Sequence, residues 1–168
     1  MEIIKKIWTC ILSFLLVAPS SVAQVQIAVV SDVHVMSPSL LKEDGKAFSD
    51  YISQDRKMLR ESASLLNAFT DSILHSSVKY LLIPGDLTKD GELVSHRYLI
   101  DNCLSRLRNA GITILVVPGN HDVNNPHAVE YQGDNKTRVA TISRSDFAQI
   151  YNDYGYGQAI ARDTASLS

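Results

Sequence analysis

The sequence is poor in cysteine and has no excess of basic residues. It holds two cysteines, Cys10 and Cys103, in 168 residues. Cys10 lies in a leading segment that we expect to be removed, so one cysteine remains and an intramolecular disulfide is excluded. Lysine and arginine number 16 against 18 aspartate and glutamate residues, a formal net charge of −2, which gives no basic surface for a nucleic-acid polymer. Any phosphate bound by this protein must therefore meet local charge, such as metal ions.

The sequence also lacks an apolar run long enough to stay in a membrane as a helix, which takes about 20 residues. Residues 1–23 instead show the order of a secretory signal: Lys5 and Lys6, an apolar run at 7–18, and small residues up to Ala23. We predict cleavage after Ala23, which makes the protein secreted or periplasmic, with no stable membrane anchor afterwards. An uncleaved anchor is the alternative.

The remaining chain alternates between strand and helix patterns. Its composition, with 45% hydrophobic and 20% charged side chains, is that of an ordinary folded protein rather than a disordered one. Three apolar runs predict buried strands, and two stretches with apolar residues at helical spacing predict helices between them. The strands are expected at 25–30, 80–83 and 112–117, and the helices at 57–75 and from Gly91 to a cap at Gly111. This order predicts an α/β fold with a βαβαβ core, a parallel sheet and right-handed crossovers.

Two stretches show no clear period. Residues 35–55 (Val35 to Asp55) predict a loop of about twenty residues, long enough to serve a function rather than only to connect. Residues 127–141 predict a second polar loop. A short helix is expected after it at 146–154, with Ser145 as its N-terminal cap.

Side chains that bind metal ions follow each of the three predicted strands. Asp32 and His34 come after the first, Gly85-Asp86 after the second, and Gly119-Asn120-His121-Asp122 after the third. In an open parallel sheet, ligands bind beyond the carboxyl ends of the strands. A single Asp or Asn at such a place is more often a turn or capping residue, but three clusters together indicate a site. Gly85 lets the chain turn sharply beside the ligands.

The residue types suit two divalent metal ions. Asp32 and His34 are two residues apart, so on an extended chain they project to the same side and would hold one ion. Asp86 would bridge two ions and Asn120 would offer a carbonyl oxygen to the second, which leaves His121 free to donate a proton. Two ions about 3.5–4 Å apart can clamp a phosphoryl group and activate a water between them.

Together the three segments resemble the calcineurin-like metallophosphoesterase family, whose pattern runs Asp-x-His, Gly-Asp, then Gly-Asn-His-Asp/Glu. The resemblance implies that Asp32 and His34 bind the first metal ion, that Asp86 bridges, and that Asn120 binds the second. It also implies that His121 contacts the phosphate or protonates the leaving oxygen, while Asp122 supports His121 through a hydrogen bond. The two ions would be Mn, Fe or Zn.

The sequence departs from the family pattern in two places. Many members carry an Asp three residues after the bridging Asp, where this chain has Lys89 and the nearest carboxylate is Asp90. The family also completes its site with a further His and a Gly-His-x-His motif, which do not follow His121 in this sequence. We therefore expect residues 24–168 to be the N-terminal part of the family's domain. In that case the fold is half of a two-sheet sandwich flanked by helices, and incomplete.

The resemblance implies a metal-dependent hydrolase that acts on a small-molecule phosphate ester. Gly85-Asp86-Leu87-Thr88 followed by Gly91-Glu92 looks most like the cyclic-nucleotide phosphodiesterase branch, so a phosphodiester is the first substrate expected. A phosphomonoesterase or nucleotidase of the same family is the alternative. A further alternative is an inactive truncated fragment, because Asp86 and Asn120 alone would hold the second ion weakly.

Three other histidines have plainer interpretations. His75 is expected at the end of the first helix, close to its C-terminal carbonyl groups. His96 is expected on the surface of the second helix. His127 is expected to be a solvent-exposed loop residue, with a role as a substitute metal ligand as the alternative.

Overall fold

The computed structural model describes residues 24–161, and the predicted signal segment lies outside them. The main sheet consists of β1 (Gln26–Val29), β3 (Val78–Pro84) and β4 (Thr113–Val117). All three strands are parallel and β3 lies in the centre. Each strand lies within two residues of the apolar run that predicts it, so the α/β fold with its βαβαβ core is confirmed.

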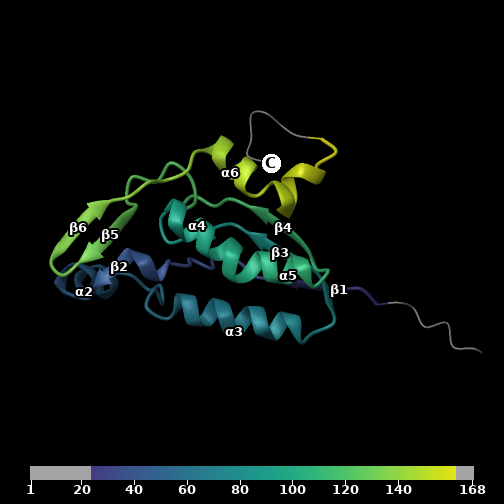
Figure 1. The fold of residues 1–168 in the computed structure, drawn as a ribbon, viewed down its shortest axis with the longest axis horizontal. Coiled ribbons are helices and arrows are strands. Elements are labelled where there is room, and N and C mark those ends of the chain that lie inside the picture. The colour runs from purple at the N-terminus through teal and green to yellow at the C-terminus, as the bar shows by residue number, and fades with distance from the viewer. Residues whose placement is uncertain (1–23, 162–168) are drawn as a thin grey trace, which may run out of the picture.

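Helices connect the strands of the main sheet (Figure 1). The first, α3 (Ser62–Leu74), lies between β1 and β3. The second connection runs through α4 (Leu93–Leu99), one π-helical turn η2 (Ile100–Leu104) and α5 (Ser105–Asn109). Both connections step across the sheet in the same direction, so crossovers of one hand place both helices on one face. The first helix begins at Ser62 rather than at residue 57, because the Asp55 side chain accepts from the Lys57 amide and holds a turn there.

The main hydrophobic core lies between the sheet and these helices. Alternate residues of β3 and β4 point into it, and the helices contribute leucines at helical spacing. Its most buried members include Leu81, Ile83, Ile114 and Val116 from the strands and Leu66, Leu99, Leu104 and Leu107 from the helices. The single cysteine of this part of the chain, Cys103, is also buried in this core and is free.

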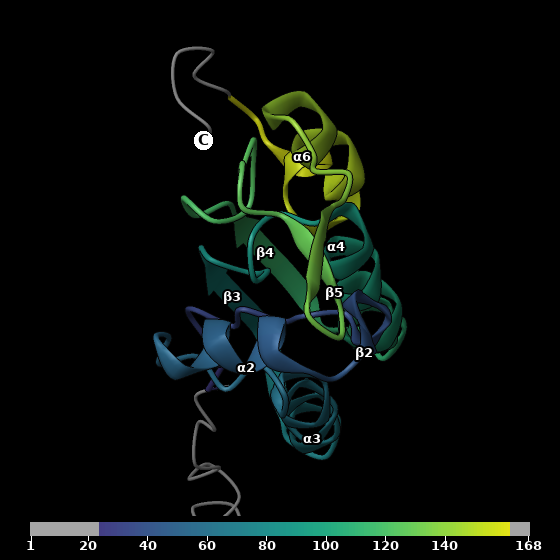
Figure 2. The same cartoon turned by 90° about the vertical axis from the view of Figure 1, so that its left-hand side faces the viewer.

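The opposite face of the main sheet is apolar and exposed. Ile27 and Val29 of β1 are 58% and 63% exposed, and Tyr80, Leu115 and Val117 of the neighbouring strands are 41–44% exposed. Strand residues alternate between the two faces, so these side chains share one face. Among the described residues, helices cover only the other face (Figure 2). This arrangement agrees with the expected half of a sandwich, in which the sheet is one layer.

A second, smaller sheet forms where the sequence predicts loops. It consists of β2 (Leu41–Glu43), β5 (Val129–Gln132) and β6 (Asn135–Arg138), with β5 in the centre and parallel to β2. Helix α2 (Lys46–Ser53) packs on it, and the rings of Phe48 and Tyr131 lie 4.9 Å apart. The prediction of loops at 35–55 and 127–141 is therefore wrong. The signal for α2 was present as apolar residues at 47, 48, 51 and 52, which is helical spacing over two turns.

The last described segment packs on the main core. Helix α6 (Arg144–Ile150) is capped by a reciprocal pair of hydrogen bonds between Ser143 and Asp146, so the cap is Ser143 rather than Ser145. Three short 3-10 turns complete the secondary structure: η1 (Pro38–Leu40), η3 (Asn152–Tyr154) and η4 (Tyr156–Gln158). None of the helices within residues 24–161 has the length and apolar character needed to cross a bilayer.

Candidate metal centre

The segments that follow β1 and β3 run side by side beyond the main sheet. The Asp32 amide donates to the Gly85 carbonyl at 3.3 Å, and the His34 amide donates to the Asp86 carbonyl at 2.9 Å. These bonds continue the pairing of the two strands past their ends. They bring side chains that are more than fifty residues apart in the sequence into one place.

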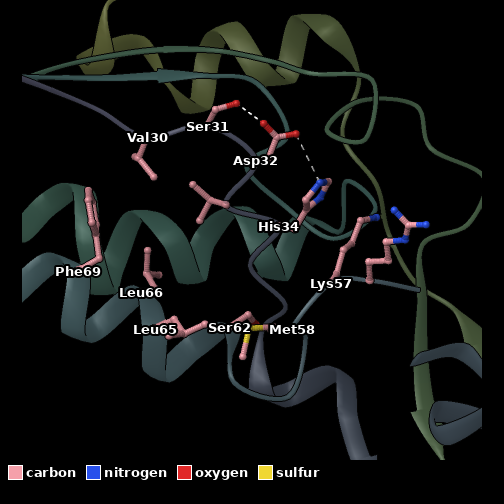
Figure 3. A pocket seen from close by; sticks show the side chains of 12 residues that line it. Val30, Ser31, Asp32, His34, Lys57, Met58, Ser62, Leu65, Leu66 and Phe69 are labelled. Atoms are coloured by element: carbon pink, nitrogen blue, oxygen red, sulfur yellow. Dashed lines mark hydrogen bonds and ion pairs between the residues drawn. The ribbon is translucent and has the colours of Figure 1, made fainter. Parts of the chain in front are cut away.

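Three predicted ligands meet at this point. Asp32, His34 and Asp86 each offer one ligand atom, and these atoms lie within 4.8 Å of one another. His34 Nε2 is 3.9 Å from Asp32 Oδ1 and 3.7 Å from Asp86 Oδ2. Figure 3 shows the side chains of Asp32 and His34 turned toward each other at the edge of a cleft. The side chain of Asp32 is 66% exposed, whereas those of His34 and Asp86 are nearly buried, so an ion held here would still face solvent on one side.

The surroundings of His34 determine which ring nitrogen is free. Nδ1 lies 3.3 Å from the Thr88 carbonyl oxygen, which can only accept, so Nδ1 carries the hydrogen. Burial, and after it the positive charge of Lys57, lowers the pKa of His34, so the ring is neutral near pH 7. Nε2 then presents a lone pair toward the carboxylates of Asp32 and Asp86. A cation between these three groups satisfies all of them, and a ligating His usually donates its other N–H to such an acceptor.

The backbone at all three ligands adopts a conformation that side chains rarely tolerate. Asp32, His34 and Asp86 have φ angles of +56°, +41° and +47°, in the left-handed region. Each such residue costs about 1–3 kcal/mol, and such conformations cluster at functional sites. The sequence pattern predicted an extended Asp32–His34 pair, so this feature is a difference between expectation and structure. Backbone of this kind at three neighbouring side chains marks a candidate functional site.

Two glycines allow Asp86 to approach the turn that follows β4. Gly85 has a φ of +90°, which confirms the sharp turn expected there. A Cβ atom on Gly119 would collide with the Asp86 carboxylate. The Asp86 Oδ1 atom also accepts from the His121 amide at 3.0 Å. Asn120 lies between Gly119 and His121 in this turn and is exposed, with no hydrogen bond from its side chain to the described residues.

His121 is held over the cluster by a carboxylate that the sequence analysis did not assign to it. Its Nδ1 atom lies 3.0 Å from Asp90 Oδ1 and 2.8 Å from the Lys89 carbonyl oxygen. Both partners accept, so Nδ1 carries a hydrogen and Nε2 remains available. The rings of His121 and His34 are edge to face with centroids 5.0 Å apart. His121 is thus next to the candidate ligands and keeps one nitrogen free for chemistry.

Asp122 has a different environment from the one expected. It is fully buried, and its two oxygens accept from the amides of Leu87, Thr88 and Gly119 and from the Thr88 hydroxyl at 2.8–3.0 Å. The hydrogen bond that the His121 ring was expected to donate to Asp122 goes to Asp90 instead. The reason is that the turn after β4 directs the Asp122 side chain inward, under the loop that follows β3. In this position Asp122 fixes the two loops to each other.

A buried ionic network lies beneath His121. Lys89 is fully buried, and its ammonium group forms ion pairs with Asp90 and, at 3.3 Å, with Glu92. The same ammonium lies 4.7 Å from the centre of the Tyr51 ring. Burial by itself would lower the pKa of Lys89, but the carboxylates of Glu92 and Asp90 outweigh it and raise the pKa above its ordinary value. The Lys at the position where many family members have Asp therefore serves to hold Asp90 in place.

The other histidines divide between confirmed and corrected expectations. His75 caps the C-terminus of α3 and His127 is exposed, as expected. The prediction that His96 lies on a helix surface is wrong, because this side chain is fully buried. Its Nε2 donates to the Asp122 carbonyl at 2.9 Å and its Nδ1 lies 2.8 Å from the Tyr151 hydroxyl. His96 therefore joins α4, the turn after β4 and α6.

Comparison with known proteins gives a family for this chain. The model of the family described as calcineurin-like phosphoesterase matches residues 25–162, which is most of the chain. The matched range contains all three segments that follow the strands of the main sheet. None of the curated proteins matches the chain.

Proposed function

The chain belongs to the calcineurin-like phosphoesterase family, and we propose that it hydrolyses phosphate esters with the help of two divalent metal ions. The observation that carries this proposal is the group Asp32, His34 and Asp86, whose ligand atoms lie within 4.8 Å of one another on left-handed backbone. Two carboxylates and one imidazole nitrogen are donors that Mn, Fe and Zn accept. The residues present therefore fit one ion of the metal centre that the family implies, and the second ion is the part that the metal count tests.

Each side chain has a defined part in this proposal. Asp32 and His34 would hold the first ion, Asp86 would be shared, and Asn120 would offer its side-chain oxygen to the second. When bound, the two ions would stabilise charge on the phosphoryl oxygens and make a water more acidic. The Thr88 carbonyl accepts from His34 Nδ1, which turns Nε2 toward the carboxylates of Asp32 and Asp86.

His121 supplies the proton that the leaving oxygen needs when its bond to phosphorus breaks. Its Nδ1–H donates to Asp90 and to the Lys89 carbonyl, so the ring must carry a second hydrogen on Nε2 to act as the acid. That imidazolium transfers the Nε2 hydrogen to the leaving oxygen and becomes neutral. Asp90 is thus a positioning residue that acts through His121. Lys89 keeps Asp90 from turning away, because the two form a buried ion pair.

The substrate we propose is a phosphodiester, with a cyclic nucleotide as the first compound to test. The support for this choice is the sequence Gly85-Asp86-Leu87-Thr88 followed by Gly91-Glu92, which resembles the cyclic-nucleotide phosphodiesterase branch. A phosphomonoester is the second candidate, since the same centre can act on either. Action outside the cytoplasm remains the proposal for location, because residues 1–23 read as a secretory signal.

The test measures metal content and hydrolysis in the same preparation. Purified protein is stripped with chelator, reloaded with Mn²⁺ and assayed with bis-p-nitrophenyl phosphate and p-nitrophenyl phosphate. We expect two ions per chain and faster release of nitrophenolate from the diester. Asp86→Asn should lose both metal and activity, whereas Asp101→Asn, an exposed carboxylate on η2, should retain both.

The outcomes separate the parts of the proposal. Faster turnover of the monoester would contradict the diesterase assignment but leave the phosphoesterase function in place. Protein that binds no ion and hydrolyses neither ester would contradict the function itself. One bound ion with no turnover would show that Asp86 and Asn120 are too few ligands for the second ion.

A further inference from the structure

A second cleft is lined by His121 but by none of the three candidate metal ligands. Its volume is about 530 Å³, and it lies between α2, the turn after β4 and the β5–β6 hairpin. His121 and Asp90 form one end of this cleft, and Tyr51 and Tyr131 lie along it. Lys136 and Arg138 of β6 line it as well. The cleft therefore connects the proposed proton donor with a pair of basic side chains.

The geometry of the hairpin directs both basic residues to the same side. Lys136 and Arg138 are two residues apart on β6, so they share one face of the strand. Their partners on β5 are Tyr131 opposite Lys136 and Val129 opposite Arg138, and both partners also line the cleft. The other face of β5 carries Glu130, which is paired with Lys42 at 2.7 Å. The face toward the cleft is thus basic, while the reverse face is neutralised.

The acidic side chains of the cleft do not neutralise this basic pair. Asp90 is paired with the buried Lys89, and Asp55 lies 3.7 Å from Lys57. Within residues 24–161, Lys136 and Arg138 have no carboxylate at ion-pair distance. Two unpaired cations therefore remain in a concave site of a chain whose formal net charge is −2.

We propose that this hairpin face is an anion subsite that binds a second phosphate group of the substrate. The proposal rests on the proposed function and narrows it within the phosphodiesters: the preferred substrate carries a further phosphate on its non-reacting part, which a simple cyclic nucleotide with one phosphate lacks. A phosphate on the leaving or remaining group would contact Lys136 and Arg138 while the scissile phosphate lies at Asp32, His34 and Asp86. Lysine and arginine are the side chains that bind phosphate by charge and by paired hydrogen bonds.

The experiment compares two chromogenic diesters that differ in one phosphate. Thymidine 5′-(p-nitrophenyl phosphate) lacks the second anion, and its 3′-phosphorylated form carries it, with the same leaving group in both. We expect wild-type kcat/KM to be about tenfold higher for the 3′-phosphorylated compound, the size expected of two exposed charge contacts. The preference should shrink as NaCl is added, because exposed charges are screened.

Variants test which residues create the preference. Lys136→Ala/Arg138→Ala should bring the ratio of the two kcat/KM values close to one. Lys79→Ala/Arg97→Ala is the matched control, since it removes one exposed lysine and one exposed arginine outside the cleft. The control should keep the wild-type ratio. A wild-type ratio of one, or an unchanged ratio in the Lys136/Arg138 variant, would overturn the subsite.

A binding measurement keeps this inference separate from the proposed function. If the protein turns over neither diester, the function fails, and calorimetric titration with thymidine 3′,5′-bisphosphate and thymidine 5′-monophosphate takes the place of the kinetic ratio. Tighter binding of the bisphosphate that is lost in Lys136→Ala/Arg138→Ala supports the subsite. Equal binding of the two nucleotides refutes it.

Discussion

Replacing Asp122 by asparagine tests whether this residue fixes the loops or supports His121. The buried carboxylate accepts four hydrogen bonds: Oδ1 from the amide and hydroxyl of Thr88, and Oδ2 from the amides of Leu87 and Gly119. An asparagine of the same shape keeps one oxygen and replaces the other with an NH₂ group. That group donates, so it cannot accept from the two donors it faces.

The better orientation of the asparagine can be derived from these contacts. With NH₂ at the Oδ2 position, the amides of Leu87 and Gly119 both lose their acceptor. With NH₂ at the Oδ1 position, the Thr88 hydroxyl can rotate and accept from it, while that oxygen also keeps its bond from the Gly91 amide. Only the Thr88 amide is then left without a partner. One buried unsatisfied donor costs about 1–3 kcal/mol, so we expect Asp122→Asn to lower the free energy of unfolding by about 2 kcal/mol.

Thermal and urea unfolding followed by circular dichroism measure this loss. For a chain of this size, about 2 kcal/mol corresponds to a Tm lower by roughly 4–8 °C. Asp122→Ala leaves all four donors without an acceptor, at a cost of about 1–3 kcal/mol each. The sum is comparable with the free energy of unfolding of a whole domain, so this variant should not fold. The reasoning is refuted if Asp122→Asn unfolds with the wild-type free energy but loses phosphodiester hydrolysis, since that result would mean that Asp122 acts through His121.

Two further substitutions test the loops that carry the candidate metal ligands and the buried side chain of His96. Gly119→Ala places a methyl group against the Asp86 carboxylate, so Mn²⁺ affinity measured by calorimetry should fall at least about tenfold. Gly111→Ala meets no neighbouring atom but strains a backbone with a φ of +86°, so it should lower the free energy of unfolding and keep the Mn²⁺ affinity. Burial holds the pKa of His96 below its ordinary value of 6.5. As the pH falls, His96 is therefore protonated in the unfolded chain at a higher pH than in the folded one, and the free energy of unfolding decreases below about pH 6.5. His96→Gln should remove this pH dependence of the free energy of unfolding, which amounts to at most about 1.4 kcal/mol per pH unit. The prediction is contradicted if the free energy of unfolding changes equally with pH in the variant and the wild type between pH 7.5 and 5.

The strands of the main sheet and the segments that carry the candidate metal ligands could be predicted because their signals are local. A run of β-branched and aliphatic residues that ends at an Asp or a Gly marks both the strand and the residues that follow it. Parallel pairing then brings Asp32, His34 and Asp86 together, as their places after the strands predict. The left-handed backbone at these residues could not be predicted, because it depends on how the two loops bind each other rather than on either segment alone.

The errors concern residues whose environment is set by distant parts of the chain. His96 is flanked in the sequence by Ser95 and Arg97. Its burial depends on Tyr151 at the end of α6 and on the turn after β4, which are far away in the sequence. Lys89 has the sequence context of an ordinary surface lysine, but in the structure Glu92 and the rings of Tyr51 and Tyr131 surround its ammonium group. The small sheet was missed because its strands are three or four residues long and one of them is entirely polar.

The roles of Asp90 and Asp122 follow from one requirement of the site. The carboxylates of Asp32 and Asp86 and the free nitrogen of His34 face one another, and all three residues have strained backbone. Such an arrangement persists only if the surrounding structure fixes it. Asp122 supplies that constraint from below: it accepts three hydrogen bonds from the loop after β3 and one from Gly119 in its own turn after β4. Because its oxygens are fully used there, the turn needs a second carboxylate to orient His121. Asp90 fills this place, and its charge is balanced by Lys89. One acidic residue therefore fixes the loops, while the other orients His121, the proton donor that we propose.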